Sequence, residues 1–350
     1  MSSESARTPR DLFPSPTPRN LFVGPLGDAV MAVPVTRELR KWGYRGTLGM
    51  PAHLAQMFRD FDLSGNARAP VSDAHELGDA VNVVAYLKRR PHTRNVPLVT
   101  EIGRHVSQEL GIPSVNVNPE DVWFSVTNDD VEQGRLFLNT ALNRALTLKR
   151  EKPIVLFHPS AGSANREIPA TTLQNTIKLL EDKIRPVFIG GKPKGAGYES
   201  TEFLKTSLSE LVQILAAADA VVSAESGPLH LAAAIAQYQM QNEDVLDRAI
   251  TPNRIIGVFG SSNPVCSYYP GMRLVLASRM SCRMANGCGF HGYAKHDPDL
   301  VEAYYPDHAV YYHKDNSACI DPKYAERSIA PCMESIEPED IANTIRNAVE

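Results

Sequence analysis

Residues 223–234 read SAESGPLHLAAA, and they are the most informative segment of the chain. We expect a strand to end near Ser223 and a helix to start at Pro228, because proline suits the first helical turn. Gly227 would let a ligand approach the backbone closely. The unpaired N–H groups and the dipole of such a helix form an anion site. An ordinary strand-to-helix turn with a solvated His230 is the alternative, because short glycine motifs also arise by chance.

Apolar runs alternate with helical patterns on both sides of this segment, as in parallel sheets covered on both faces. The expected strands are 20–23, 46–50, 80–86, 153–158, 185–191, 220–223, 254–259 and 273–277. The expected helices are 28–41, a segment after Pro51, 97–110, 129–148, 170–183, 208–218, 228–236 and 337–349. The segment 237–253 is expected to be a surface loop or an extra helix. This order predicts an α/β protein with two Rossmann-like domains in series.

The domain limits follow from changes in composition along the chain. Residues 1–19, polar and rich in serine and proline, are expected to form a flexible tail. Residues 20–150 would form the first domain and 151–336 the second, with 337–350 as a C-terminal helix. Within the second, residues 267–335 hold most of the tyrosines and four of the five cysteines, and predict an irregular appendage.

The composition excludes several classes of protein. Hydrophobic residues make up 43% of the chain and charged residues 22%, which is typical of a globular protein. The formal net charge of -4 argues against a nucleic-acid partner. The sequence shows no signal peptide and no apolar run long enough to span a bilayer. We therefore expect a cytoplasmic protein, with peripheral contact at the inner membrane face as a further expectation.

Several ordered motifs resemble glycosyltransferase family 9, the ADP-heptose:lipopolysaccharide heptosyltransferases. The longest is 208–234 (LSELVQILAAADAVVSAESGPLHLAAA), followed by 256–260 (IGVFG). Gly27 and Asp28, with Pro34 six residues later, look like the family's G-D-x-x-x-x-x-P. Residues 157–169 (FHPSAGSANREIP) are similar to its strand and loop before K-x-W-P, and 332–338 (CMESIEP) echoes a common ending. Ordered motifs along one chain are far more specific than any one of them.

The resemblance implies a GT-B fold, in which two Rossmann-like domains face each other across a cleft. It also implies that Asp28 is the general base on the acceptor hydroxyl. An N-cap role for Asp28 is a compatible alternative. Arg166 stands at the family's basic position and would neutralise the donor phosphates, while Ile168 replaces the family's tryptophan.

The remaining donor-side residues come from the same comparison. Glu225 stands where the family has an aspartate, whose side chain is one methylene shorter. Glu199 is a candidate for a contact with the ribose of the donor. The expected donor-binding set is Ser160, Gly162, Ser163, Arg166, Glu199, Glu225, Ser226, Gly227, Pro228, Leu229 and His230. Ordinary loop polarity is the alternative for the serines near residue 160.

Two further features bear on the acceptor and on metals. The run 88–94 (KRRPHTR) would let Arg89, Arg90 and Arg94 bind an acidic acceptor, although a solvated basic loop also explains it. The cysteines of the appendage suit a structural zinc or iron site, although simple buried thiols are the alternative. These candidate ligands are Cys282, Cys288, Cys319 and Cys332.

Together these features predict an inverting, metal-independent glycosyltransferase, with no cofactor needed for catalysis. The expected donor is a nucleotide-diphosphate sugar, an ADP-sugar with a heptose-like sugar being favoured. The expected acceptor is a glycan or glycolipid of the lipopolysaccharide type. A transferase acting on a protein or a modified nucleic-acid base is the alternative, as is a non-catalytic nucleotide-binding protein on the same scaffold.

Overall fold

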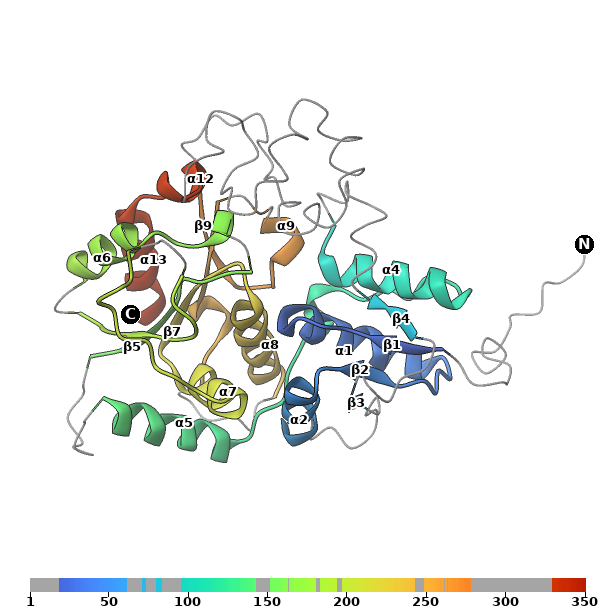
Figure 1. Cartoon of the computed structure of the whole chain (residues 1–350). Helices are drawn as coiled ribbons and strands as arrows, with labels where there is room; N and C mark the ends of the chain where they lie inside the picture. Colours follow the sequence, from blue (N-terminus) through green and yellow to red (C-terminus); the bar gives the residue numbers. More distant parts are fainter. Residues whose placement is uncertain are drawn as a thin grey trace, which may run out of the picture.

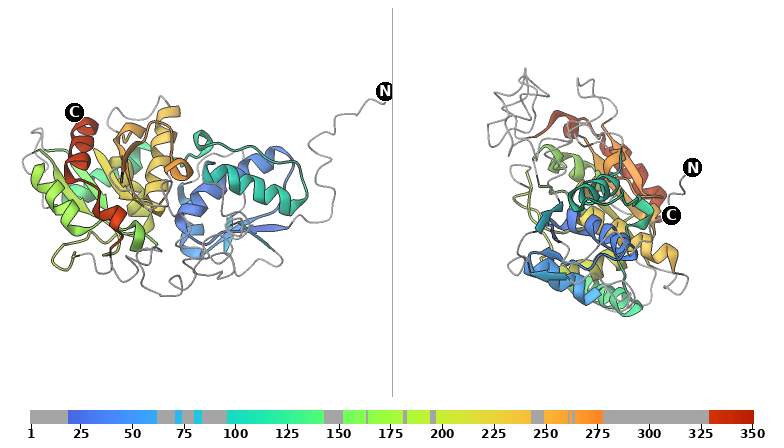
Figure 2. Two further views of the ribbon diagram at one scale, coloured as in Figure 1. Left: turned by 90° about the horizontal axis from the view of Figure 1, so that it is seen from above. Right: turned by 90° about the vertical axis from the view of Figure 1, so that its right-hand side faces the viewer.

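The computed structural model describes residues 19–61, 71–73, 80–83, 96–142, 152–162, 164–180, 183–193, 197–242, 249–260, 262, 264–277 and 329–350. These residues form two lobes, each built on a parallel sheet (Figure 1; Figure 2). The α/β architecture predicted from the sequence is therefore confirmed. Among the described helices, none combines the length and apolar composition needed to cross a bilayer.

The first lobe contains a sheet with the strand order β3-β2-β1-β4. Its strands are β1 (Asn20–Phe22), β2 (Leu48–Met50), β3 (Val71–Asp73) and β4 (Ala80–Asn82), all parallel. Its helices are α1 (Leu26–Lys41), α2 (Ala52–Phe61) and α4 (Leu98–Leu110). The sequence pattern did not predict β3, because its three residues VSD carry no apolar run.

The second lobe contains a sheet with the strand order β6-β5-β7-β8-β9. Its strands are β5 (Ile154–His158), β6 (Arg185–Phe188), β7 (Ala220–Ala224), β8 (Ile255–Phe259) and β9 (Arg273–Leu276), all parallel. Chain order reverses between β5 and β7. The crevice beyond the carboxyl ends of two such strands is the usual ligand site of an open α/β sheet.

Helices cover both faces of this second sheet. The helices from Asn128 onward are α5 (Asn128–Ala141), α6 (Ala170–Leu179), α7 (Leu208–Ala217), α8 (Gly227–Gln241), α9 (Pro264–Ser267), α12 (Pro331–Glu334) and α13 (Pro338–Val349), and the 3₁₀ turns are η4 (Pro119–Asp121), η5 (Ala164–Arg166) and η6 (Pro252–Arg254). Helix α8 runs on to Gln241, so the segment expected as a separate insertion begins as a continuation of this helix.

Successive residues of β5 alternate between two cores. Leu156 packs into a core that continues into the first lobe, while Val155 and Phe157 pack into a second core shared with α6 and α13. All five residues of β5 are buried, as expected for a strand covered on both faces.

Helix α5 lies beside α7 of the second lobe, although the sequence placed it in the first domain (Figure 1). The link that precedes it is bonded to α8, since Phe124 N–H donates to Ala234 C=O at 3.0 Å. The domain limits stay a prediction, and we propose that the second domain begins near Asn128 rather than at residue 151.

Helices α1 and α8 pack against each other and join the two lobes. Both are rich in alanine and other small apolar residues and are buried nearly all round over their first turns. A helix with no polar face is stable only when it is covered on every side. Here a sheet covers one side of each helix and the facing helix of the other lobe covers the opposite side, which places both N-termini at one point between the lobes.

Candidate active site

A cavity of about 290 Å³ lies between the lobes where α1 and α8 begin. Four segments line it: the start of α1, the start of α4, the end of β5 with the loop after it, and the turn from β7 into α8. The lining residues are Pro25, Leu26, Gly27, Asp28, Met31, Leu98, His158, Ser160, Ala161, Gly162, Arg166, Glu225, Ser226, Gly227, Pro228 and His230. The cavity therefore contains residues from both predicted sites: the predicted general base in the first lobe and the predicted donor-binding residues in the second.

The N-termini of two helices converge on this cavity. Ser226 is the N-cap of α8 and Pro228 lies in its first turn, as the sequence predicted. The Ser226 side chain does not cap the helix, because its hydroxyl is engaged elsewhere. Helix α1 likewise starts at Leu26 without a side-chain cap. Two uncapped N-termini give the cavity a positive potential that suits a diphosphate.

The two N-termini touch through a pair of glycines. A Cβ atom added to Gly227 would lie 3.0 Å from Cβ of Leu26 and 3.3 Å from the backbone nitrogen of Gly27. One added to Gly27 would lie 2.8 Å from Cδ2 of His230. A side chain at Gly27 would therefore force His230 or α1 to shift, and one at Gly227 would require the start of α1 to move slightly.

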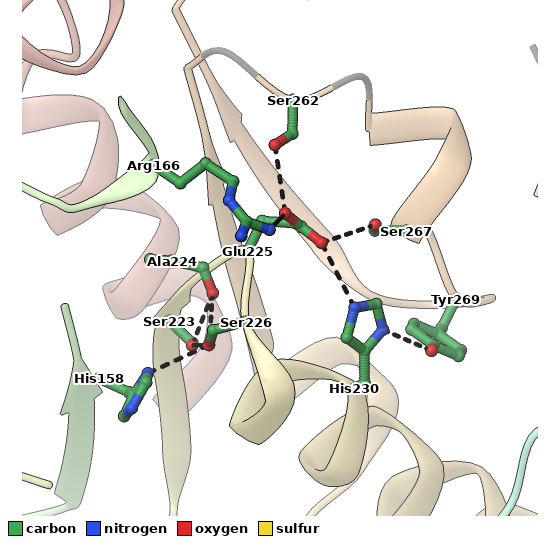
Figure 3. A network of polar contacts seen from close by, with 10 residues as sticks. All are labelled: His158, Arg166, Ser223, Ala224, Glu225, Ser226, His230, Ser262, Ser267 and Tyr269. Carbon is green, nitrogen blue, oxygen red and sulfur yellow. Dashed lines mark hydrogen bonds and ion pairs between the residues drawn. The ribbon is translucent and has the colours of Figure 1, made fainter. Parts of the chain in front are cut away.

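The Glu225 carboxylate is buried, and four side chains bind it (Figure 3). Arg166 Nη1 forms an ion pair with Oε2. Ser262 donates to Oε2 and Ser267 to Oε1, each at 3.2 Å. His230 Nε2 lies 3.4 Å from Oε1. Burial on its own would raise the pKa of this carboxyl, but the charge of Arg166 and the contacts with His230 outweigh it and hold the pKa well below its usual range.

His230 belongs to the donor-binding set expected from the sequence. In the structure it is buried, and both ring nitrogens already face protein groups: Nδ1 lies 2.7 Å from the Tyr269 hydroxyl and Nε2 faces Glu225 (Figure 3). A solvated histidine, the alternative reading, is wrong for the same reason. Its geometry supports a role through Glu225 rather than a direct bond to phosphate.

Asp28 lies in the first turn of α1 and lines the cavity. It is not the N-cap, because that position belongs to Pro25. Burial raises its pKa to about 6; His230 opposes the rise, Glu225 adds to it and Arg166 opposes it. A carboxylate with this pKa is ionised at neutral pH and is a stronger base than an ordinary aspartate, as general-base catalysis requires.

His158, which the sequence analysis did not single out, connects two donor-side segments. Its Nδ1 lies 3.1 Å from Ser226 Oγ and its Nε2 lies 3.2 Å from Ser160 Oγ. Burial lowers the pKa of His158 to about 4, so the ring is neutral at pH 7. Its place at the carboxyl end of a buried strand is the signal that could have identified it.

Three other contacts of the site were also missed. Ser262, Ser267 and Tyr269 follow β8 and reach Glu225 or His230 from the far side. The two serines come after the carboxyl end of a parallel strand, which is a weak signal. No pattern in the sequence singles out Tyr269.

The structure does not bring every predicted residue into the cavity. Glu199 is exposed on the loop after β6 and is not among the lining residues, so its ribose contact stays a prediction. Leu229 is fully buried, with Cδ2 directed toward Gly257, and belongs to the core. Ser163, Arg89, Arg90 and Arg94 lie outside the described residues.

The cysteine prediction falls mostly outside the described part of the chain. Cys332 lies in α12 and packs against the second core. Cys282, Cys288 and Cys319 are outside the described residues, so the zinc or iron site stays a prediction. Within the described ranges, no group of three or more His, Cys, Asp or Glu side chains is arranged to hold a metal ion.

A family model matches the central part of the chain. Residues 128–240 match the model of glycosyltransferase family 9 (heptosyltransferase). This range begins with α5 and includes Arg166 and the Glu225–His230 turn, but not Asp28. The family resemblance stated from the motifs is thereby confirmed. A comparison with curated protein sequences finds no match.

Solved structures share the fold at low sequence identity. TibC from enterotoxigenic E. coli H10407, described as a bacterial iron-containing dodecameric glycosyltransferase, is 16% identical, with a TM-score of 0.57 over 95% of this chain and 76% of TibC. A glycosyl transferase family 9 structure from Veillonella parvula DSM 2008 is 12% identical, with a TM-score of 0.57 over 96% of this chain and 98% of the other. The GT-B fold implied by the motifs is confirmed.

Proposed function

We propose that this chain, which resembles glycosyltransferase family 9 in its motifs and in residues 128–240, is an inverting glycosyltransferase. It would move a heptose-like sugar from an ADP-sugar to the hydroxyl of a glycan acceptor of the lipopolysaccharide type. One observation carries the proposal: a buried carboxylate with raised pKa, Asp28, shares a cavity with Arg166 under two helix N-termini.

The donor diphosphate suits the second-lobe side of the cavity. Negative charge that builds on the leaving diphosphate would be stabilised by the N–H groups at the start of α8 and by Arg166. Arg166 is held in the cavity by Glu225, and its guanidinium can pair with that carboxylate and a phosphate oxygen at the same time. These groups supply the positive charge that the leaving group needs, and we therefore propose that transfer requires no metal ion.

Asp28 faces the same cavity from the first lobe. It would take the proton of the acceptor hydroxyl, whose oxygen attacks the anomeric carbon from the side opposite the diphosphate. The new glycosidic bond forms as the bond from carbon to phosphate oxygen breaks, so the configuration inverts. No nucleophilic side chain takes part.

The ADP-sugar donor is supported by TibC, one of whose structures is described as a heptosyltransferase in complex with ADP-D-beta-D-heptose. That structure is 16% identical, with a TM-score of 0.56 over 95% of this chain and 77% of TibC. A bound ligand stabilises the native state. Thermal unfolding measured with ADP-, GDP- and UDP-sugars therefore tests which nucleotide the protein binds. Stabilisation by a GDP- or UDP-sugar, without any by an ADP-sugar, would refute the choice of ADP.

Two variants test the assigned roles. Asp28→Ala should abolish transfer while ADP still binds, and Arg166→Ala should weaken ADP binding by about 10-fold or more. Arg135→Ala is the matched control, since Arg135 is a half-buried arginine of α5 that pairs with Glu132 and does not line the cavity. Substantial turnover by Asp28→Ala would remove Asp28 as the base.

The acceptor is tested by mass spectrometry of a lipopolysaccharide core glycan, of candidate proteins and of nucleic acid after incubation with the donor. Transfer of sugar to the glycan supports the proposed acceptor. Transfer only to a protein or to a nucleic-acid base would show that the acceptor is of that class instead. Full activity in EDTA supports metal independence. Donor binding without transfer or hydrolysis under all conditions would favour a non-catalytic binding protein.

A further inference from the structure

His158 occupies the place where the two donor-side segments meet. It ends β5, beside β7 at the reversal of strand order, and it lines the cavity. A Cβ atom added to Gly190, behind the ring, would lie 2.6 Å from Nε2 and 3.8 Å from Ser160 Oγ. The imidazole is thus held between a backbone wall and two hydroxyls, and its orientation is set by packing.

The hydrogen bonds around the ring can be counted proton by proton. Ser223 donates to Ala224 C=O at 2.8 Å, and Ser226 Oγ lies 3.1 Å from the same carbonyl oxygen and 3.2 Å from Ser223 Oγ (Figure 3). When Ser226 donates to that carbonyl, its oxygen can only accept from His158, so Nδ1 carries the ring proton. Nε2 is then bare and accepts from Ser160. In this arrangement Ser160 directs only lone pairs at the cavity, which does not suit an anion.

The second tautomer reverses the direction of both bonds. Ser226 turns its proton to Nδ1, Nε2–H donates to Ser160, and the Ser160 proton becomes available to the cavity. Ala224 C=O keeps the bond from Ser223. The change loses one bond between neutral groups and gains one to a phosphate oxygen. A hydrogen bond to an ionised acceptor is roughly twice as strong as a neutral one.

We propose that His158 is a positioning residue that changes tautomer when a diphosphate binds, so that the Ser160 hydroxyl donates to a phosphate oxygen. The inference rests on the proposed function, because it takes the donor diphosphate as the ligand. A neutral ring is needed, since a doubly protonated imidazole could not accept from Ser226. The lowered pKa of His158 agrees with this requirement.

The direct test is the tautomer itself. In protein labelled with ¹⁵N-histidine, a protonated and a bare ring nitrogen have well-separated shifts. We expect His158 to carry its proton at Nε2 in the ADP complex and at Nδ1 without ligand. His105, a buried histidine whose Nε2 lies 3.1 Å from Asn82 C=O and which does not line the cavity, should not change. Inorganic pyrophosphate should cause the same change as ADP.

Affinity for ADP gives an independent readout. Ser160→Ala removes the hydroxyl that would donate to the phosphate. His158→Asn keeps an amide near the position of Nδ1 but cannot reach Ser160. Each variant should weaken ADP binding by about 10-fold. The double variant should lose no more than either single one, because the two residues act through one bond. His158→Gln, whose amide reaches the position of Nε2, should recover part of the loss. His105→Gln is the matched control, and thermal unfolding checks that each variant folds.

The outcomes separate this inference from the proposed function. If ADP binds the wild-type protein while the ring keeps one tautomer and Ser160→Ala binds as tightly, the role of His158 is refuted and the transferase proposal stands. Additive losses in the double variant would also refute it. If neither ADP nor pyrophosphate binds, the donor assignment falls, and this inference falls with it.

Discussion

The raised pKa of Asp28 predicts a pH dependence that an ordinary aspartate would not show. The ordinary pKa is 3.8, and burial raises it to about 6. With that pKa, roughly nine tenths of the protein carries the base form at pH 7 and roughly one tenth at pH 5. An aspartate with the ordinary value would remain more than about nine tenths ionised at pH 5. We therefore expect kcat/KM to fall by about 10-fold from pH 7 to pH 5.

The assay measures kcat/KM for transfer between pH 4.5 and 8.5, since this quantity reports the free enzyme. Protein stability supplies a second readout that needs no substrate. Because the folded pKa is raised, ionised Asp28 lowers the free energy of unfolding as pH rises from about 4 through about 6, by up to about 3 kcal/mol. Asp28→Asn should therefore be more stable than wild type at pH 7.5, and the difference should vanish near pH 4.

A kcat/KM that is flat from pH 5 to pH 8 would refute the reasoning. So would an Asp28→Asn variant that unfolds with the wild-type midpoint at pH 7.5, because a buried charge would then carry no cost. Arg135→Gln, in α5 and away from the cavity, is the control for a general effect of charge.

Two further predictions concern the packing around the cavity. Glu225→Ala removes the buried carboxylate that Arg166 and His230 face. The free energy of unfolding measured in urea titrations should therefore drop by about 3 kcal/mol. A loss below about 1 kcal/mol would show that the Arg166–Glu225 pair is solvated. Gly27→Ala introduces a Cβ 2.8 Å from His230, and the displaced α1 should lower kcat/KM by about 100-fold. Gly24→Ala, where nothing lies within 4 Å of the added Cβ, should retain wild-type kcat/KM, and equal activity of the two variants would contradict the contact.

Local sequence patterns predicted most of the individual elements. The strands β5, β7 and β8 were recognisable because each is a continuous apolar run bounded by polar or glycine-rich turns. The start of α8 was recognisable from Gly227 and Pro228, which carry the backbone requirements of a helix N-terminus. Helix ends were predicted less well: α8 continues to Gln241 through polar residues, of which Gln237 and Gln239 are buried.

The sequence by itself determined most of the strands and helices, although not β3, and the start of α8 directly after β7. It also predicted an anion site at that helix start and placed Asp28 at the start of α1. Each of these depends on residues close together in the chain. The tertiary structure decided what surrounds these groups. Ser267 and Tyr269 reach Glu225 and His230 from about 40 positions further along the chain. The pKa of Asp28 is raised because burial removes water from its carboxyl, and desolvation depends on distant atoms that no local pattern specifies.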